Sequence, residues 1–371
     1  MSAFDILAVG DAAACRSEPA TILADVAPLL RTARVVFGQL EAPVSARGEP
    51  NPVAKLAMRS PPNFANVLGD AGFTLMSAAG NHCLDYGPEA LADTLALLPA
   101  AGIGVAGAGA TLEAALAPAI QTLACGTRVA LIAASSILPT GYAASPNSAG
   151  CVPMWAHTSY ESIEPDQPAT PPRVISRADS TDLDRLARAV RAARKEAALV
   201  LVSLHWGIHM ITGVIADYQR EVARALVAAG ASAILGHHPH LLKGIEFIDG
   251  VPVFYSLGNF AIEQPQAFDP AIVDSASFRH LLSLNPGSSP ESLYVLPPET
   301  RLTGVVRLEV EGAQIARVRF HPCRVADDSS PVPLHPQEPA FGEVQAYLER
   351  VTAMAGLNAR FRVEKDALRV F

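Results

Sequence analysis

The sequence predicts an α/β fold, because short apolar runs alternate with amphipathic, alanine-rich segments along most of its 371 residues. The apolar runs are typical of buried strands and lie near Ile6, Val35, Phe73, Ile103, Val129, Val200, Ile234 and Val253. The helical segments cover residues 88–101, 182–197 and 216–229. Gly87-Pro88 precedes the first of them and Gly230 follows the last, as expected at the two ends of a helix. This is the pattern of β-α units.

Two regions depart from this pattern. Between about residues 138 and 178 the periodicity disappears and Pro, Ser and Thr accumulate, which predicts a long irregular insertion. Such an insertion is expected to wall or cover a pocket, with an ordinary solvated loop as the alternative. The second irregular region runs from about residue 263 to residue 298.

The C-terminal part predicts an antiparallel hairpin followed by a helix. Residues 302–309 and 315–322 alternate apolar and polar side chains around Glu311-Gly312, as expected for a hairpin with one buried face. Residues 340–357 follow as an amphipathic helix. Since a hairpin needs partners to bury its face, we place it on the main sheet system. The predicted organisation is a domain over residues 1–262, which includes the insertion, with residues 263–371 packed on it.

Composition and charge limit the class of protein. The net charge of −8 argues against binding to phosphate backbones, since a nucleic-acid partner requires a concentrated basic face. Half of the residues are apolar, yet no stretch is long and uncharged enough to span a bilayer. Residues 1–5 lead almost directly into the first strand, so we expect no signal peptide or membrane anchor. The five cysteines show no Cys-x-x-Cys spacing, which fits a reducing, cytoplasmic compartment.

The most informative segment is Gly236-His237-His238-Pro239-His240. It follows the apolar run of residues 231–235, so three imidazoles gather where a predicted strand ends in a loop. Open α/β sheets carry their chemistry at such strand ends. Imidazole is a common ligand of transition metals near neutral pH, and a His-x-His spacing can aim two ring nitrogens into one cavity. A histidine cluster without a ligand is the alternative, but three histidines after one strand favour a site.

Other predicted strands also end in side chains that bind metals. Asp11 and Glu41 end two runs near the N-terminus, Asn81-His82 closes a third, and His205 ends a fourth. A divalent ion needs such a mixture of oxygen and imidazole donors from several strands, because no single loop supplies enough ligands in one geometry. Each residue alone can be explained as a cap or a turn, whereas five strand ends together favour a metal site. Mn, Zn or Fe suits these donors better than Ca or Mg.

The order of these residues resembles the bacterial CapA family, which is named for poly-gamma-glutamate capsule synthesis and is similar in fold to the calcineurin-like metallophosphoesterases. The resemblance runs from about residue 6 to about residue 260. The matching segments are Gly10-Asp11 with Arg16, Leu40-Glu41-Ala42-Pro43, Asn81-His82-Cys83-Leu84-Asp85-Tyr86-Gly87, His205-Trp206-Gly207, the GHHPH segment and Tyr255-Ser256-Leu257-Gly258-Asn259-Phe260. The fold that the resemblance implies is a β-sandwich flanked by helices (αββα).

The resemblance also implies roles for individual residues. The metal-site positions are Asp11, Glu41, Asn81, His205, His238 and His240. His82 is the candidate proton donor and Asp85 lies near enough in sequence to orient it, while Asp11 is a catalytic candidate as well as a ligand. His237 is expected to be a neighbour of the site. Candidates for binding an anionic group of the substrate are Arg16, Arg279 and His280.

Two positions depart from the family pattern. Dinuclear phosphoesterases usually carry an Asp-x-His at the first strand, whereas Asp11-Ala12-Ala13 offers no histidine, so one of two metal positions lacks a ligand. Either one or two ions are therefore consistent with the sequence. Gln39 stands where capsule-type relatives tend to have Asn, which changes a wall of the pocket.

We interpret the chain as a metal-dependent hydrolase that acts on a phosphoester or on an amide or peptide bond of a small anionic substrate. The first alternative is a metal-independent peptide epimerase or racemase, in which Asp11 and a histidine exchange a proton next to a carbonyl. The second is a non-catalytic binding protein on a phosphoesterase-like fold. The expected partner is a small molecule or a peptide, with neither nucleic acid nor membrane, and the oligomeric state stays open.

Overall fold

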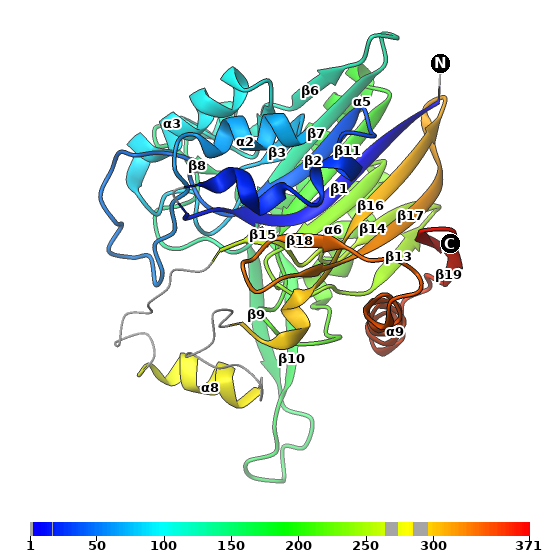
Figure 1. Cartoon of the computed structure of the whole chain (residues 1–371). Coiled ribbons are helices and arrows are strands. Elements are labelled where there is room, and N and C mark those ends of the chain that lie inside the picture. Colours follow the sequence, from blue (N-terminus) through cyan, green and yellow to red (C-terminus); the bar gives the residue numbers. More distant parts are fainter. Residues whose placement is uncertain (1–2, 17, 264–273, 285–295) are drawn as a thin grey trace.

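The centre of the molecule is a pair of β-sheets packed face to face, shown in Figure 1. This computed structural model describes residues 3–16, 18–263, 274–284 and 296–371. Within them, the first sheet has ten strands, with the order β19-β20-β17-β16-β1-β2-β3-β4 and with β15 beside β1 and β18 beside β17. These strands are β1 (Phe4–Ala13), β2 (Val35–Leu40), β3 (Leu75–Ser77), β4 (Gly104–Ala106), β15 (Asn259–Ile262), β16 (Leu302–Glu311), β17 (Gln314–Val325), β18 (Pro331–Pro333), β19 (Phe361–Glu364) and β20 (Ala367–Val370).

The second sheet has the order β13-β14-β12-β11-β7-β6 in the described chain. Its strands are β6 (Ala119–Thr122), β7 (Arg128–Ser135), β11 (Leu199–His205), β12 (Ala233–His237), β13 (Ile245–Ile248) and β14 (Val251–Phe254). Strands β7, β11, β12 and β14 run parallel, as do β1 to β4 in the first sheet. The carboxyl ends of the parallel strands within each sheet therefore lie at one edge.

Both sheets are covered on both faces, which explains their continuous apolar runs. In β1, Ile6 and Ala8 pack between the sheets, whereas Leu7 and Val9 point the other way, toward 3-10 helix η1 (Pro19–Leu23), α1 (Ala27–Leu30) and α2 (Phe64–Ala71). In β11 the alternation repeats, with Leu201 between the sheets and Val200 against α5 (Ser180–Glu196) and α6 (Asp217–Ala228). The layers are thus helix, sheet, sheet and helix, and the predicted αββα fold class is confirmed.

Eight predicted strands and three predicted helices are present in the described residues. The apolar runs became β1, β2, β3, β4, β7, β11, β12 and β14. The helices are α3 (Gly87–Ala100), α5 (Ser180–Glu196) and α6 (Asp217–Ala228), which lie within two residues of their expected ends, and the short α4 (Leu112–Leu116) was not predicted. Asp179 caps α5, because its side chain accepts hydrogen bonds from the backbone amides of Thr181 and Asp182.

The C-terminal region adds strands to the first sheet itself. The predicted hairpin is confirmed as β16 and β17, and β16 pairs antiparallel with β1. The predicted final helix is α9 (Pro339–Met354). The prediction stopped there and missed β19 and β20, which return the chain to β17. The domain boundary at residues 262 and 263 stays a prediction.

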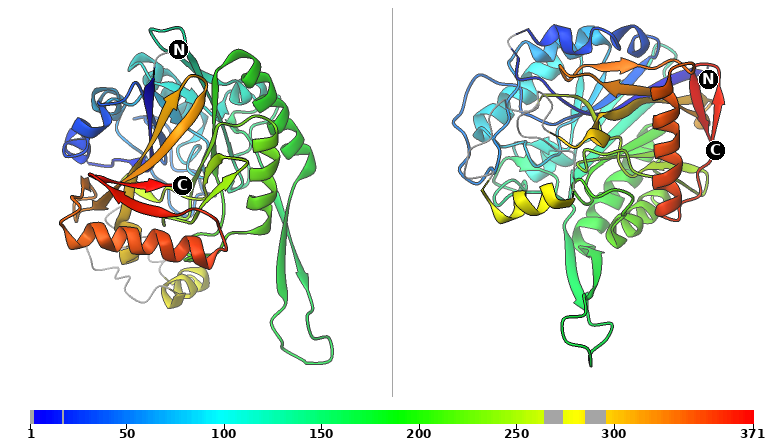
Figure 2. Two further views of the ribbon diagram at one scale, coloured as in Figure 1. Left: turned by 90° about the vertical axis from the view of Figure 1, so that its right-hand side faces the viewer. Right: turned by 60° about the horizontal axis from the view of Figure 1, so that its bottom comes forward.

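The insertion at residues 138–178 is more regular than predicted. It contains β8 (Gly150–Cys151), which pairs with β5 (Ala108–Gly109), and a hairpin of β9 (Ala156–Glu161) and β10 (Arg173–Ala178). In Figures 1 and 2 this hairpin projects from the body of the molecule. The expectation of an irregular segment is wrong for residues 156–161 and 173–178, because strands exposed on both faces carry no apolar alternation. The prolines from 165 to 172 lie in the connection between the two strands.

The second irregular region, residues 263–298, lies largely outside the described residues. Its described part includes α8 (Ala276–Leu284), and 3-10 helix η2 (Pro298–Arg301) follows. Among the described residues, no helix combines the length and the apolar character needed to cross a bilayer.

Candidate metal centre

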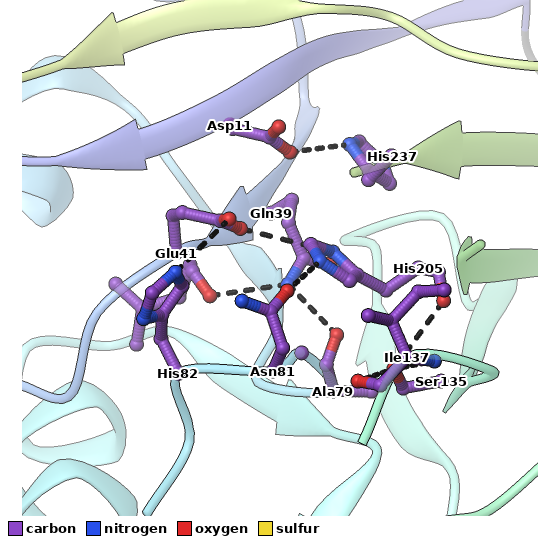
Figure 3. Close-up of polar contacts among 12 residues, drawn as sticks. Asp11, Gln39, Glu41, Ala79, Asn81, His82, Ser135, Ile137, His205 and His237 are labelled. Carbon is purple, nitrogen blue, oxygen red and sulfur yellow. Dashed lines mark hydrogen bonds and ion pairs between the residues drawn. The ribbon is translucent and has the colours of Figure 1, made fainter. Parts of the chain in front are cut away.

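Four polar side chains from the ends of four strands meet between the two sheets, as Figure 3 shows. Asp11 lies on β1 and Glu41 directly follows β2, while His205 and His237 are the last residues of β11 and β12. All four are at most 1% exposed. Since β1 and β2 belong to the first sheet and β11 and β12 to the second, each sheet supplies half of this group.

The distances within the group are those of a compact polar cluster. Possible ligand atoms of Asp11, Glu41 and His205 all lie within 4.8 Å of one another. His237 Nδ1 is 3.1 Å from Asp11 Oδ1, and His205 Nδ1 is 3.7 Å from Glu41 Oε2. His240 approaches both carboxylates, with Nδ1 3.4 Å from Asp11 Oδ2 and Nε2 3.7 Å from Glu41 Oε1. The cluster thus has two carboxylates surrounded by three imidazoles.

Several buried atoms of this cluster have no hydrogen-bond partner among the described residues. They are Asp11 Oδ2, both carboxylate oxygens of Glu41, His205 Nδ1 and His237 Nε2. A buried polar atom without a partner costs about 1–3 kcal/mol, so five of them in one place are unusual in a folded protein. A divalent cation bound between the carboxylates would satisfy oxygens and imidazole nitrogens together. The residues therefore fit a metal site.

The two carboxyl groups have opposite pKa shifts. Burial raises the pKa of Glu41 well above its usual value, and the negative charges of Asp11 and Asp85 raise it further. Burial also tends to raise the pKa of Asp11, but the close contacts and positive charges of His237 and His240 outweigh it and lower that pKa. Of the two groups, Glu41 is therefore the one that binds a proton more readily in the absence of a cation.

Burial also favours the neutral form of His205. It lowers the pKa of His205 well below its usual value, the negative charge of Asp11 opposes this shift, and the positive charges of neighbouring histidines add to it. His205 Nε2 lies 2.7 Å from Asn81 Oδ1, so this nitrogen donates the hydrogen bond. The other nitrogen, Nδ1, then carries a lone pair toward Glu41, as a metal ligand requires. Asn81 thereby fixes the tautomer of His205. The role as a ligand that the resemblance implied for Asn81 stays a prediction.

His82 and Asp85 form a pair beside the carboxylates. His82 Nδ1 is 2.5 Å from Asp85 Oδ2, and His82 Nε2 is 4.0 Å from Glu41 Oε1. Asp85 also accepts hydrogen bonds from the amide of Met58, at 2.7 Å, and from Tyr142 Oη, at 3.0 Å. These contacts hold Asp85 in place, and Asp85 holds the ring of His82 with Nε2 directed at the cluster. Tyr142 belongs to the insertion, so residues before β9 support the site.

The GHHPH segment divides its histidines between two places. His237 shares one face of β12 with Ala233 and Leu235, which pack between the sheets, and its ring lies 5.6 Å from the ring of Phe37. The period of two in a strand predicts this orientation, which places His237 beside Asp11. Its role as a neighbour of the metal site stays a prediction. His240 Nδ1 is 2.7 Å from Asn259 Oδ1 and faces the carboxylates.

His238 lies farther out. Its ring centroid is 5.0 Å from that of His205 and 5.3 Å from that of His209, and among the described residues no ion pair joins it to a carboxylate. Its role as a ligand stays a prediction. The φ angles of His238 and His240 are +93° and +57°, and residues other than glycine rarely adopt positive φ angles. Such backbone conformations cost roughly 1–3 kcal/mol each and occur preferentially at functional sites.

The predicted substrate-binding residues are not gathered at the cluster. Arg16 donates to Glu263, with Nε 2.5 Å from Oε1, and also to Thr21 and to the carbonyl of Asp328. Arg279 and His280 lie on α8 and are exposed. No described contact joins either of them to Asp11 or Glu41, so their role in substrate binding stays a prediction. Gln39 donates to the carbonyls of Leu40 and Ala79 and thus fastens β2 to the loop before Asn81.

Residues 5–264 match the family model described as bacterial capsule synthesis protein PGA_cap. The chain belongs to this family. The resemblance to CapA proteins is thereby confirmed over the part of the chain that carries both sheets' parallel strands and the candidate ligands.

Individual relatives in the capsule synthesis family cover part of the chain. It is 30% identical over 240 residues to the PGA biosynthesis protein CapA of Bacillus subtilis, which covers 64% of this chain and 56% of that protein. It is 28% identical over 242 residues to the capsule biosynthesis protein CapA of Bacillus anthracis, with 64% and 53% covered. A probable polyglutamine synthesis accessory protein of Mycobacterium tuberculosis is 27% identical over 284 residues, with 76% and 66% covered. The chain spans just over half the length of the two Bacillus relatives.

Among solved structures, the calcineurin-like phosphoesterase YfkN from Bacillus subtilis is similar over 94% of this chain and 98% of that chain. The TM-score is 0.41 and the sequence identity is 13%. A similarity of this size supports no conclusion about activity.

Proposed function

We propose that this member of the capsule synthesis family is a metal-dependent hydrolase of a phosphoester or amide bond in a small anionic substrate. One observation carries the proposal. Asp11 and Glu41 are fully buried side by side with unpartnered oxygens, and His205 presents an unpartnered nitrogen to them. Two buried carboxylates are strongly unfavourable unless a cation binds them, so the fold retains this arrangement at a cost in stability.

Asp11, Glu41 and His205 would hold the ion, with His237 and His240 next to them. The mixture of carboxylate and imidazole donors suits Mn, Zn or Fe. When bound, a divalent ion lowers the pKa of a coordinated water and polarises the bond under attack. The first sheet supplies the charge of the site and the second sheet supplies most of the imidazoles.

His82 is the proton donor in this proposal. Its Nε2 is directed toward Glu41, and its Nδ1 is held by Asp85, so the ring is oriented without occupying the space between the carboxylates. The side chain is 13% exposed, whereas His205 and His237 are completely buried. His82 can therefore reach both the substrate and solvent, as a group that gives and regains a proton must.

The epimerase alternative is weaker on geometric grounds. It needs an acid and a base on opposite sides of a substrate carbon. The fully buried Asp11 and His237 are instead in direct contact at 3.1 Å, which leaves no space for a carbon between them. A non-catalytic binding protein has no evident use for an oriented pair such as His82 and Asp85. We therefore rank the hydrolase first.

The test combines metal loading with two chromogenic substrates. The purified protein is depleted with a chelator, reloaded with Mn²⁺, Zn²⁺ or Fe²⁺, and assayed with bis(p-nitrophenyl) phosphate and with γ-glutamyl-p-nitroanilide. The second probe carries an amide bond in a small molecule with a free carboxylate, as the amide branch of the proposal requires. We expect one of the two to be hydrolysed only after reloading, and that activity to be absent in Glu41→Gln.

Glu343→Gln is the matched control, because Glu343 is an exposed carboxylate on α9 paired with Arg324. This variant should hydrolyse the same substrate as the parent, with the same dependence on metal. A parent protein that binds none of the three metals would remove the basis of the proposal. Equal rates of hydrolysis with and without metal would also contradict the proposal.

A further inference from the structure

After β1, two consecutive backbone amides and one guanidinium surround a single carboxylate. The amides of Cys15 and Arg16 donate to Glu263 Oε2 at 2.7 and 2.9 Å, and Arg16 Nε donates to Glu263 Oε1 at 2.5 Å. Successive amides that point at one anion form an anion-binding nest, and a guanidinium matches the geometry of a carboxylate. We call the two amides and the Arg16 side chain the amide nest. It binds both oxygens of the Glu263 carboxylate.

The amide nest is supported by contacts that do not involve Glu263. The amide of Ala14 donates to Ser60 Oγ at 3.1 Å, which fixes the backbone just before the nest. The Arg16 guanidinium also donates to the backbone carbonyl of Asp328. The Asp328 side chain is the second carboxylate near this guanidinium in the described chain, with Oδ2 3.8 Å from Nη1. The nest is therefore held in place whether or not Glu263 occupies it.

The amide nest lies at the same edge of the first sheet as the candidate metal centre. Strands β1 and β15 run parallel, and Asp11 pairs with Asn259 in their register. Cys15 and Glu263 each lie four residues farther along the chain, so the nest is at most about 14 Å from Asp11. A substrate no longer than a short peptide can span the distance between the two places.

The amide nest is accessible from solvent and needs an acceptor. The side chains of Arg16 and Glu263 are 19% and 17% exposed, whereas Asp11 is completely buried. The amides of Cys15 and Arg16 have no other acceptor among the described residues, so removal of Glu263 leaves two donors for another group to satisfy. A carboxylate that arrives from solvent offers the same two oxygens as the Glu263 side chain.

We propose that the amide nest is a subsite for a carboxylate of the substrate, and that Glu263 occupies it in the ligand-free protein and is displaced when the substrate binds. The subsite deepens the proposed function and rests on it for the position of the reacting bond. Displacement exchanges one carboxylate for another, so Asp328 faces the same charge in the nest before and after. The substrate class is thus a molecule with a free carboxylate within about 14 Å of the bond that reacts.

The experiment measures carboxylate binding without any reaction. Glutarate is titrated calorimetrically into the parent, Glu263→Ala, and Glu263→Ala combined with Arg16→Gln, each with and without Mn²⁺. We expect Glu263→Ala to bind glutarate at least roughly tenfold more tightly than the parent, because the internal competitor no longer occupies the nest. The combined variant should lose this gain. Glu263→Gln keeps the size of the side chain without its charge and should also bind glutarate more tightly than the parent.

Thermal unfolding with added acetate is the second measurement. Glu263→Ala should have a lower Tm than the parent, and acetate should raise that Tm, whereas chloride at the same ionic strength should not. The matched control is Glu343→Ala, which removes an exposed carboxylate paired with Arg324. Its Tm should respond equally to acetate and chloride, and its affinity for glutarate should equal that of the parent.

Equal affinity of the parent, Glu263→Ala and Glu263→Gln for glutarate would show that Arg16 and Glu263 form only a structural ion pair, and would overturn the subsite. A gain in affinity that persists in the combined variant would overturn it as well, because glutarate would then bind elsewhere.

The proposed function can fail separately. If the parent binds no metal, the hydrolase proposal falls, and the comparison of glutarate affinities in the metal-free proteins still decides the subsite. If the subsite is overturned while metal-dependent hydrolysis remains, the proposed function stands alone.

Discussion

The candidate metal centre and the β9–β10 hairpin differ in how their side chains are buried. At the metal centre, carboxylates and imidazoles are excluded from water and five of their polar atoms have no partner in the described chain. In the hairpin, apolar side chains face solvent instead: Tyr160 is 71% exposed and its cross-strand neighbour Val174 is 58% exposed. Polar groups inside and apolar groups outside both depart from the usual distribution.

The two distributions differ in their cost to the stability of the fold. An unpartnered buried carboxylate lowers the stability of the whole fold, so its presence indicates a ligand. A few exposed apolar residues on a projecting hairpin cost little and indicate nothing by themselves. The unpartnered groups of the first region therefore indicate a function, whereas the exposed residues of the second region do not.

The largest effect is expected at His205. Replacing it with Ala removes one of the three groups whose ligand atoms lie within 4.8 Å, so the metal should be lost and turnover should fall by about 10³-fold or more. The fold should persist, because β11 keeps its apolar residues. Metal content by elemental analysis, turnover and circular dichroism measure the three parts of this prediction. A variant with parental metal content would show that His205 is not a ligand.

The next effect is expected at His82. His82→Asn should reduce turnover on the order of 10²- to 10⁴-fold with unchanged metal content, because it removes a proton donor. Asp85→Asn should have a smaller effect, since it loosens the ring of His82 without removing it. Steady-state kinetics combined with metal analysis separates the two roles. If His82→Asn lost its metal, His82 would be a ligand and another group would be the acid.

A third prediction concerns stability and pH in the metal-free protein. Since the pKa of Glu41 is raised in the fold, the folded protein keeps a proton that the unfolded chain has already released. The free energy of unfolding should therefore fall as the pH rises from about 4.5 toward the raised pKa of Glu41. Glu41→Gln should remove this dependence and be more stable than the parent above that window, by about 1–3 kcal/mol.

Urea unfolding of both proteins between pH 5 and pH 8 measures the difference. Burial lowers the pKa values of His205 and His238, which gives the opposite trend below pH 6.5, but both histidines are present in each protein. Their effect therefore cancels in the comparison. Parallel curves for parent and variant would mean that Glu41 is ionised in the metal-free fold.

The smallest effect is expected in the hairpin. Residues 159–175 can be replaced by an Asn-Gly turn, because Thr158 and Ser176 are paired in the register of β9 and β10. Its described side-chain contacts run to α5 and α6, at Asp179, Asp217 and Glu221, and none of them reaches the metal centre. Metal content, KM for the chromogenic substrate and turnover should all match the parent. A changed substrate affinity would show that the insertion covers the site after all.

The sequence predicted the fold and most of the cluster because both depend on strands with buried faces. Apolar runs located β1, β2, β11 and β12, and the polar residues at their ends came together as strand parallelism requires. Asp11, Glu41 and His205 follow from this reasoning alone. His237 would have followed too if the alternation along β12 had been applied.

Other features could not be predicted because they depend on tertiary contacts. His82 and Asp85 both lie in the loop after β3, so their pairing is local. The hydrogen bond from Tyr142 to Asp85, in contrast, joins residues that are 57 positions apart in the sequence. His209 belongs to an irregular loop whose position is set by Lys243 and Pro239. Strands β9 and β10 bury neither face, so no apolar period marks them.

Anomalous diffraction from crystals of the purified protein tests the central claim most directly. Data collected at the absorption edges of Mn, Fe and Zn should show a peak between β1, β2 and β11, bonded to oxygens of Asp11 and Glu41 and to Nδ1 of His205, at about 2.0–2.2 Å for zinc. The same data from Glu41→Gln should show no peak. An empty position in crystals of metal-loaded parent protein, or a peak bonded to other residues, would contradict the account.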